Sequence, residues 1–315
     1  MLSTPWSRSF GLRIPIVNAP MGGVAGGRLA AAVSAAGGLG MVGMGSVATR
    51  ELLQTELQHV HGTFGIGLVD WVMRNEAGLL EDALAAEPVL LSVSFGTDWS
   101  WVGKARDAGI ATVTQVYDSL GARQAVDAGV DILVARGSEG GGHGDVKLAT
   151  LPLLDTVLDA VSVPVLAGGG VASARSLAAV LAAGASGAWV GTRLAACPEA
   201  LTGDGSRRAL IAARATDTRV TRAFDVAQGR PWPAWFPSRV LTNDFVTRWT
   251  GREDVLASDR PAREELAASI DADDRRVAPV TAGEAVGMIS DDASVAEVIE
   301  QMCSGAERLL SAWGA

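Results

Sequence analysis

The feature that most constrains this chain is an alternation of short apolar runs with Ala-rich amphipathic stretches through its first two-thirds. Short apolar runs bounded by Gly or Asp are typical of buried strands, and amphipathic stretches are typical of helices. Their alternation predicts a parallel sheet built from βα units. We predict eight strands, at Pro15–Ala19, Gly40–Met44, Phe64–Leu68, Val89–Phe95, Ile110–Thr114, Asp131–Ala135, Val163–Ala167 and Gly187–Val190.

The spacing of these strands favours a closed barrel over an open doubly wound sheet. Their carboxyl ends fall near residues 21, 44, 67, 95, 115, 136, 168 and 191, at successive intervals of 23, 23, 28, 20, 21, 32 and 23 residues. A (β/α)8 barrel requires such a quasi-regular period, because each unit contains one strand, one helix and two short loops. An open sheet tolerates less regular spacing. We therefore predict an α/β fold, a (β/α)8 TIM barrel.

Residues 216–281 depart from the barrel pattern, because they are rich in Arg, Asp, Pro and Trp, with an aromatic and proline cluster at 232–237. We predict a small lid and substrate subdomain here. Helical periodicity returns at residues 282–315, which predicts a helix that packs back on the barrel. Residues 1–215 and 282–315 would then form the barrel. The apolar stripe of that last helix consists of Val295, Val298, Ile299, Met302, Leu309 and Leu310.

Charge and cysteine content exclude several classes of protein. The net charge is −9 and the basic residues form no cluster, which argues against a nucleic-acid partner. Cys197 and Cys303 lack metal-ligand spacing, so we expect no metal site, no disulfide framework and a reducing cytoplasm. The chain begins without a continuous apolar signal segment, and glycines interrupt the uncharged stretch 29–49. We therefore expect a cytoplasmic protein with no membrane partner.

Glycine motifs offer two candidate phosphate sites of unequal value. Residues 38–43 match the dinucleotide fingerprint GxGxxG, but they would enter a strand and not a helix, so we interpret them as a helix-to-strand turn. Residues 168–170 and the pair Gly191-Thr192 directly follow the seventh and eighth strands. At neighbouring strand ends of a barrel, such glycines either make tight turns or direct backbone N–H groups at a phosphate. We favour the phosphate site.

Residues 136–145 form a glycine-rich loop after the sixth strand, with His143 inside it. Glycines let the backbone approach a flat ligand, and a histidine titrates near neutral pH. Loops at this end of a barrel carry function, so His143 is a candidate site residue, although a solvated loop histidine is the alternative. His59 and His61 lie at the end of a predicted helix, where we expect surface positions.

Four segments resemble, in order, the signatures of the nitronate monooxygenase family, formerly called 2-nitropropane dioxygenases. These are FMN-dependent TIM-barrel flavoproteins. The segments are residues 14–23 (IPIVNAPMGG), 137–144 (GSEGGGHG), 164–171 (PVLAGGGV) and 190–193 (VGTR).

The resemblance implies a site for FMN and a catalytic residue. Residues of the first strand end would border the flavin ring, Gln115 would reach it, and the glycine tips would hold the phosphate. His143 would be the catalytic histidine, which accepts an α-proton or stabilises a nitro group. The implied FMN-binding residues are Ala19, Pro20, Met21, Gly22, Gln115, Gly142, Gly168, Gly169, Gly170, Gly191 and Thr192.

Three residues depart from the family pattern. Gly67 stands where a strand-ending Asn is usual, Gly140 replaces an Ala, and Arg136 replaces a common Gln. Arg136 would be either a fixed cation near the flavin N1–C2 edge or the partner of Glu139 or Asp145 in a surface salt bridge.

The reaction that the resemblance implies is oxidation of alkyl nitronates with O₂ to a carbonyl compound and nitrite. Two alternatives stay open. One is an NAD(P)H-dependent reductase of quinones or enoyl thioesters on the same fold, and the other is a flavin-binding protein without catalysis. The expected partners are a small-molecule substrate and O₂, while NAD(P)H and a homodimer also remain open.

Overall fold

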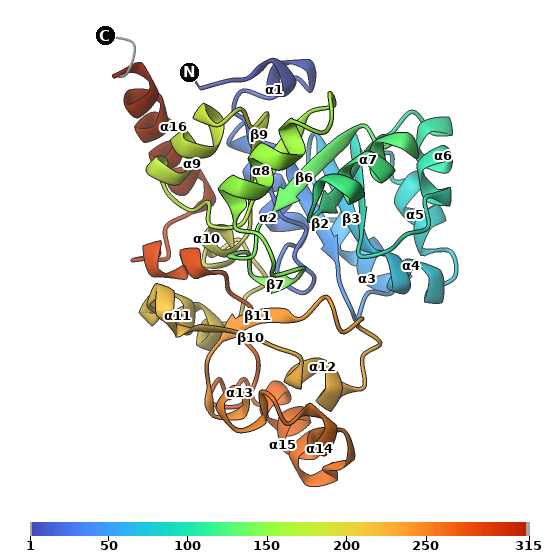
Figure 1. Ribbon diagram of the computed structural model, residues 1–315, viewed down its shortest axis with the longest axis vertical. Coiled ribbons are helices and arrows are strands. Elements are labelled where there is room, and N and C mark those ends of the chain that lie inside the picture. The colour runs from blue at the N-terminus through green and yellow to red at the C-terminus, as the bar shows by residue number, and fades with distance from the viewer. Residues whose placement is uncertain (1, 313–315) are drawn as a thin grey trace.

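The computed structural model describes residues 2–312, within which eight parallel strands form a near-closed barrel (Figure 1). This confirms the predicted fold class, and no predicted strand end is displaced by more than two residues. The order around the sheet is β1-β9-β8-β6-β5-β4-β3-β2. The strands are β1 (Ile16–Asn18), β2 (Gly40–Met44), β3 (Phe64–Val69), β4 (Leu90–Ser94), β5 (Ala111–Val116), β6 (Ile132–Arg136), β8 (Val165–Gly168) and β9 (Gly187–Val190).

The seam between β1 and β2 is held by one buried side chain as well as by the backbone. A parallel bridge joins Val17 to Leu39. The Asn18 amide nitrogen donates to the Met41 carbonyl at 2.9 Å, and its Oδ1 accepts from the Met41 N–H at 2.7 Å. Asn18 is fully buried. Its amide therefore satisfies both backbone groups of Met41 where ladder hydrogen bonds are sparse.

Replacing Asn18 with alanine should destabilise the barrel by about 2–6 kcal/mol, because it leaves a buried N–H and a buried C=O without partners, at about 1–3 kcal/mol each. Urea denaturation would measure the loss in the free energy of unfolding. Asn75→Ala is the matched control, because Asn75 is exposed at the end of α4 (Asp70–Asn75). Equal stability of the two variants would show that the backbone alone closes the seam.

Helices surround the barrel, and the last of them returns to it from the carboxyl end of the chain (Figure 1). α16 (Val295–Ser311) packs against α9 and α2, with Val295, Val298, Ile299 and Met302 buried, whereas Leu309 is exposed. The other helices of this body are α1 (Pro5–Ser9), α2 (Gly27–Ala35), α3 (Arg50–Leu57), α4, α5 (Leu79–Ala85), α6 (Ser100–Asp107), α7 (Ser119–Asp127), α8 (Thr150–Leu158), α9 (Ala174–Ala182), α10 (Thr192–Ala195) and α11 (Asp204–Ala212).

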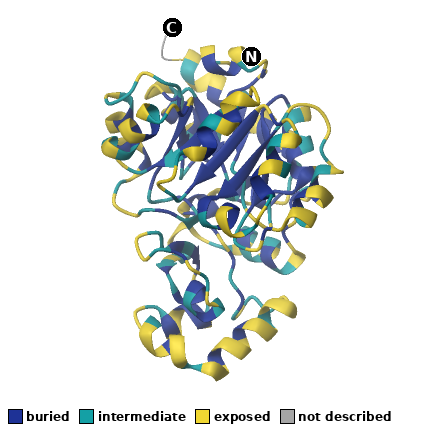
Figure 2. Ribbon diagram, turned by 90° about the vertical axis from the view of Figure 1, so that its right-hand side faces the viewer, coloured by how far each residue is buried: buried dark blue, intermediate teal, exposed yellow. Residues whose placement is uncertain are grey.

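The segment 216–281 forms a smaller body over the carboxyl ends of the barrel strands (Figures 1 and 2). It has its own apolar core, which includes Phe224, Phe245 and Trp249. The exact division at residues 215 and 282 stays a prediction. Its elements are η1 (Ala215–Asp217), β10 (Thr218–Thr221), α12 (Ala223–Gln228), β11 (Ser238–Leu241), α13 (Asp244–Trp249), α14 (Glu253–Ser258) and α15 (Arg260–Asp271), and η2 (Glu284–Met288) follows it.

A three-stranded antiparallel sheet joins this body to the barrel. Its order is β10-β11-β7, and β7 (Gly142–His143) comes from the loop after β6. His143 pairs with Ser238 and Gly142 with Arg239. The extra strand accounts for the long interval between the sixth and seventh barrel strands. Residues 142–143 of the predicted glycine-rich loop therefore form a strand, and their pairing with β11 fixes the backbone.

The uncharged stretch 29–49 and the GxGxxG match fold as the local sequence predicts. The stretch 29–49 contains most of α2 and all of β2, and the GxGxxG match leads into β2. Across residues 2–312, every helix is too short or too polar to cross a bilayer. Cys197 and Cys303 are both buried free thiols, and burial raises the pKa of each to about 12. Both cysteines therefore stay protonated and unreactive near neutral pH.

Candidate active site

A cavity of about 400 Å³ lies at the carboxyl ends of the barrel strands, beneath the 216–281 body. Ligand sites in (β/α)8 barrels occur at this end, and the volume is that of a small-molecule site. The walls come from both bodies, because Phe224, Asp225, Gln228, Arg230 and Trp232 line it opposite the strand ends.

The cavity brings together eleven of the twelve site residues predicted from the sequence. The exception is Gly168, the last residue of β8, whose carbonyl accepts a hydrogen bond from the Gly137 N–H at 2.8 Å within the sheet. The eleven lining residues are Ala19, Pro20, Met21, Gly22, Gln115, Gly142, His143, Gly169, Gly170, Gly191 and Thr192.

One end of the cavity presents backbone donors. Gly169 and Gly170 have φ of +98° and +70°, in the left-handed region that favours glycine. Within residues 2–312 their N–H groups donate no hydrogen bond. Thr192 begins the short helix α10 beside them, and its Oγ1 accepts from the Gly283 N–H at 3.0 Å. Such a cradle of free N–H groups can bind an anion such as a phosphate.

The position of Pro20 explains why glycine stands at position 67. A Cβ atom on Gly67 would overlap the ring of Pro20, which lines the cavity. An Asn side chain at position 67 therefore cannot be accommodated unless Pro20 moves. In this chain the Pro20 ring fills the space beside β3.

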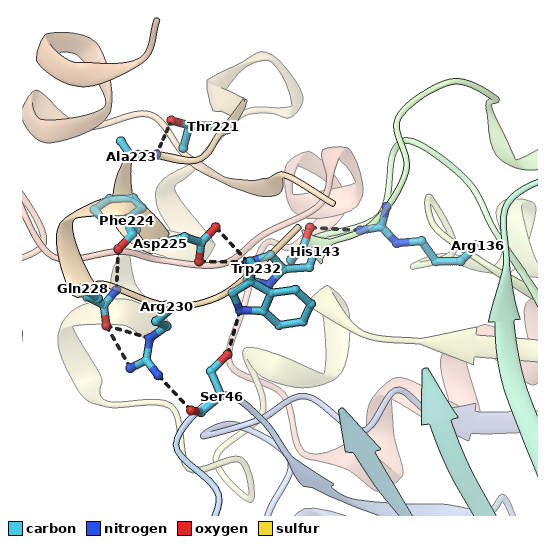
Figure 3. Close-up of polar contacts among 11 residues, drawn as sticks. Ser46, Arg136, His143, Thr221, Ala223, Phe224, Asp225, Gln228, Arg230 and Trp232 are labelled. Carbon is cyan, nitrogen blue, oxygen red and sulfur yellow. Dashed lines mark hydrogen bonds and ion pairs between the residues drawn. The ribbon is translucent and has the colours of Figure 1, made fainter. Parts of the chain in front are cut away.

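His143 makes polar and stacking contacts that the sequence did not predict (Figure 3). Its Nε2 lies 3.0 Å from each carboxylate oxygen of Asp225. The Trp232 ring stacks on the imidazole with the centroids 3.6 Å apart and the planes at 7°. The side chains of His143 and Asp225 are 18% and 9% exposed. The imidazole is thus held between a carboxylate and an indole, both from the 216–281 body.

A second set of contacts ties the same segment to the loop after β2 (Figure 3). Trp232 Nε1 donates to Ser46 Oγ at 3.0 Å, and Arg230 donates to the Ser46 carbonyl at 2.9 Å. Phe95 packs edge-on against Trp232, with the ring centroids 5.0 Å apart. Trp232 belongs to the aromatic and proline cluster that marks residues 232–237 in the sequence. No local sequence pattern identifies Ser46 or Asp225 as site residues.

Arg136 is buried, which contradicts one of its two alternatives, the surface salt bridge to Glu139 or Asp145. One guanidinium nitrogen donates to the three successive carbonyls of residues 140–142, at 2.9, 2.9 and 3.1 Å. Arg136 is only 5% exposed, and burial lowers the pKa of its guanidinium. The carbonyl dipoles offset part of the desolvation cost and hold the loop that carries His143 in a tight curve.

The histidines at 59 and 61 are exposed, as predicted, and neither lines this cavity. Within the described chain, no group of His, Cys, Asp and Glu side chains could hold a metal ion.

The site combines a cavity at the strand ends, a backbone anion cradle and a half-buried histidine. This combination is typical of an α/β-barrel enzyme. Residues 4–65 and 75–305 match the model of the nitronate monooxygenase family, and the chain belongs to this family of oxidoreductases.

Proteins that are similar to this chain differ in name. A hydroxy-methyl-oxo-octahydroindene-carboxyl-CoA dehydrogenase from Rhodococcus jostii is 31% identical, over 78% of this chain and 67% of its own length. The structure of FabK from Thermotoga maritima superposes with a TM-score of 0.84 at 26% identity, covering 100% of this chain and 99% of FabK. A nitroalkane oxidase from Streptomyces ansochromogenes superposes with a TM-score of 0.83 at 26% identity, covering 98% and 99%.

Proposed function

We propose that this chain binds FMN in the central cavity and oxidises alkyl nitronates with O₂ to a carbonyl compound and nitrite. The observation that carries the proposal is the position of His143. It lines the same cavity as the anion cradle formed by the Gly169 and Gly170 N–H groups. We also propose that residues 216–281 act as a lid, because their side chains form the wall opposite the strand ends.

The residues present fit the cofactor. The glycine cradle matches a single terminal phosphate, and a Cβ on Gly191 would lie at ordinary contact distances, 3.5 Å from Met21 Sδ and 3.6 Å from Ala19 Cβ. The flanking Ala19, Pro20 and Met21 supply apolar surface for a flat ring. Bound FMN would supply the redox chemistry, taking electrons from the substrate and passing them to O₂.

The protein groups would bind, orient and exclude water. His143 can take an α-proton from a neutral nitroalkane or donate a hydrogen bond to the anionic nitro group of a nitronate. The lid contacts of Trp232 and Arg230 with Ser46 close the cavity beside His143 and limit the entry of water.

Two measurements test this function. FMN released from the purified protein by heat should be identified by chromatography, and recovery of FAD, or failure to reconstitute with FMN, would contradict the cofactor. Anaerobic mixing of the yellow protein with propionate 3-nitronate should bleach the flavin rapidly, whereas NADH and NADPH should not. Rapid bleaching by NADH or NADPH alone would favour the reductase.

A specific observation supports a thioester substrate as the second candidate. Arg230, Arg260 and Arg263 line a second cavity of about 530 Å³, which shares Arg230 and Gln228 with the first. Glu264 and Asp271 also line this cavity, and Arg260 is paired with Glu264 at 2.6 Å. Arg230 and Arg263 are then the cations that could bind the phosphates of a nucleotide carrier such as CoA. The similar Rhodococcus protein is by name a carboxyl-CoA dehydrogenase, which favours the same substrate class. Saturable binding of CoA to the resting protein would support this candidate.

A further inference from the structure

His143 belongs to a barrel loop, yet its side-chain partners come from the lid (Figure 3). Asp225 lies in α12, and Trp232 lies in the segment between α12 and β11. The backbone of His143 also pairs with Ser238 of β11. The lid therefore fixes the imidazole by three independent contacts.

The contact with Asp225 determines which ring nitrogen carries a hydrogen. A carboxylate only accepts hydrogen bonds, and Nε2 lies 3.0 Å from both of its oxygens. Nε2 must therefore be the donor, so a neutral His143 ring has its lone pair on Nδ1. Within residues 2–312, Nδ1 has no hydrogen-bond partner.

The stacked indole prevents the ring from changing this arrangement. A rotation of the imidazole that brought Nδ1 toward Asp225 would have to pass through the Trp232 ring plane, which lies parallel at 3.6 Å. Trp232 is itself anchored, through Nε1 to Ser46 and by edge contacts with Phe95 and Trp71. Trp232 thus fixes the plane of the His143 ring and preserves the tautomer that Asp225 selects.

We propose that Asp225 is a positioning residue that holds His143 as the Nε2–H tautomer and leaves Nδ1 as the base. This inference rests on the proposed function for its chemistry. The α-C–H bond of a neutral nitroalkane breaks, the proton moves to Nδ1, and the electron pair stays on the substrate, which becomes the nitronate. The Asp225 carboxylate then stabilises the imidazolium. Because Asp225 belongs to the lid, the base is complete only when the lid is seated.

Asp225→Asn tests the proposal with little change in volume. The amide can donate to Nε2 and so favours the opposite tautomer, as in the catalytic triad of serine proteases. We expect kcat/KM for a neutral nitroalkane to fall by about 10²-fold or more, the usual scale for general-base catalysis. For the preformed nitronate we expect a change below about threefold, because no α-proton remains to be removed. Asp225→Glu should recover part of the nitroalkane activity.

The control is Asp244→Asn, which alters an exposed aspartate at the start of α13 in the same lid. Equal losses of kcat/KM on nitroalkane and nitronate in Asp225→Asn would overturn the proposal, since they indicate general damage to the site.

A second readout does not depend on turnover. ¹⁵N chemical shifts of the His143 ring, assigned with His143→Ala, should show a protonated Nε2 in the wild type and a protonated Nδ1 in Asp225→Asn. An Nδ1–H tautomer in the wild type would overturn the proposal even if the variant does not fold. If the wild type oxidises neither substrate, the nitronate function fails, and the tautomer measurement still decides the role of Asp225.

Discussion

Replacing His143 with alanine should leave FMN bound while lowering turnover of the correct substrate by about 10²-fold or more, the scale of a positioned acid–base group. His143 lines the central cavity but lies outside the anion cradle formed by Gly169 and Gly170. Its loss should therefore affect the reaction more than the cofactor. Steady-state kinetics, with the flavin absorbance spectrum as the measure of occupancy, would test this.

The choice of substrate separates two roles for His143. If it removes a proton, kcat/KM should fall more for a nitroalkane than for its nitronate at the same pH. An electrostatic role toward the nitro group would produce the reverse order. His59→Ala is the control, because His59 is exposed and away from the cavity. Unchanged kcat/KM on every active substrate would eliminate His143 as a catalytic residue.

Replacing Gly191 with leucine should weaken FMN binding by about fivefold or more. The Cβ itself meets Met21 and Ala19 at ordinary contact distances, but the longer side chain must enter the space beside them. Such overpacking costs about 1–3 kcal/mol, and about 1.4 kcal/mol corresponds to a factor of ten. Equilibrium titration of the apo-protein with FMN measures the change in Kd.

Gly191→Ala is the matched control, because it carries the same backbone change without the bulk and should retain FMN. Gly169 is a poorer test of the same idea. A Cβ there would lie 2.9 Å from Thr150 Oγ1 and 3.0 Å from the Gly137 carbonyl, so a substitution would disturb the loop and not only the cradle. Full FMN affinity in Gly191→Leu would place the cofactor elsewhere.

Much of the fold could be predicted from local sequence. Each barrel strand is a short apolar run with its own bounding glycine or aspartate, and the near-constant interval between strand ends is a property of the chain alone. Most of the candidate cavity could be predicted for the same reason. In a barrel, every parallel strand ends at the same face, so residues that follow strands must gather there.

The sequence by itself therefore determined the βα period, the strand-end glycines and the single histidine placed among them. Only the tertiary structure determined which side chains contact that histidine. Asp225 is 82 residues from His143, and Trp232 is 186 residues from Ser46, so no local periodicity couples them. Arg136 likewise could be assigned to the loop carbonyls only once the loop had a conformation. Contacts of this kind arise when residues 216–281 pack on the barrel, because burial then forces polar groups to find partners across the interface.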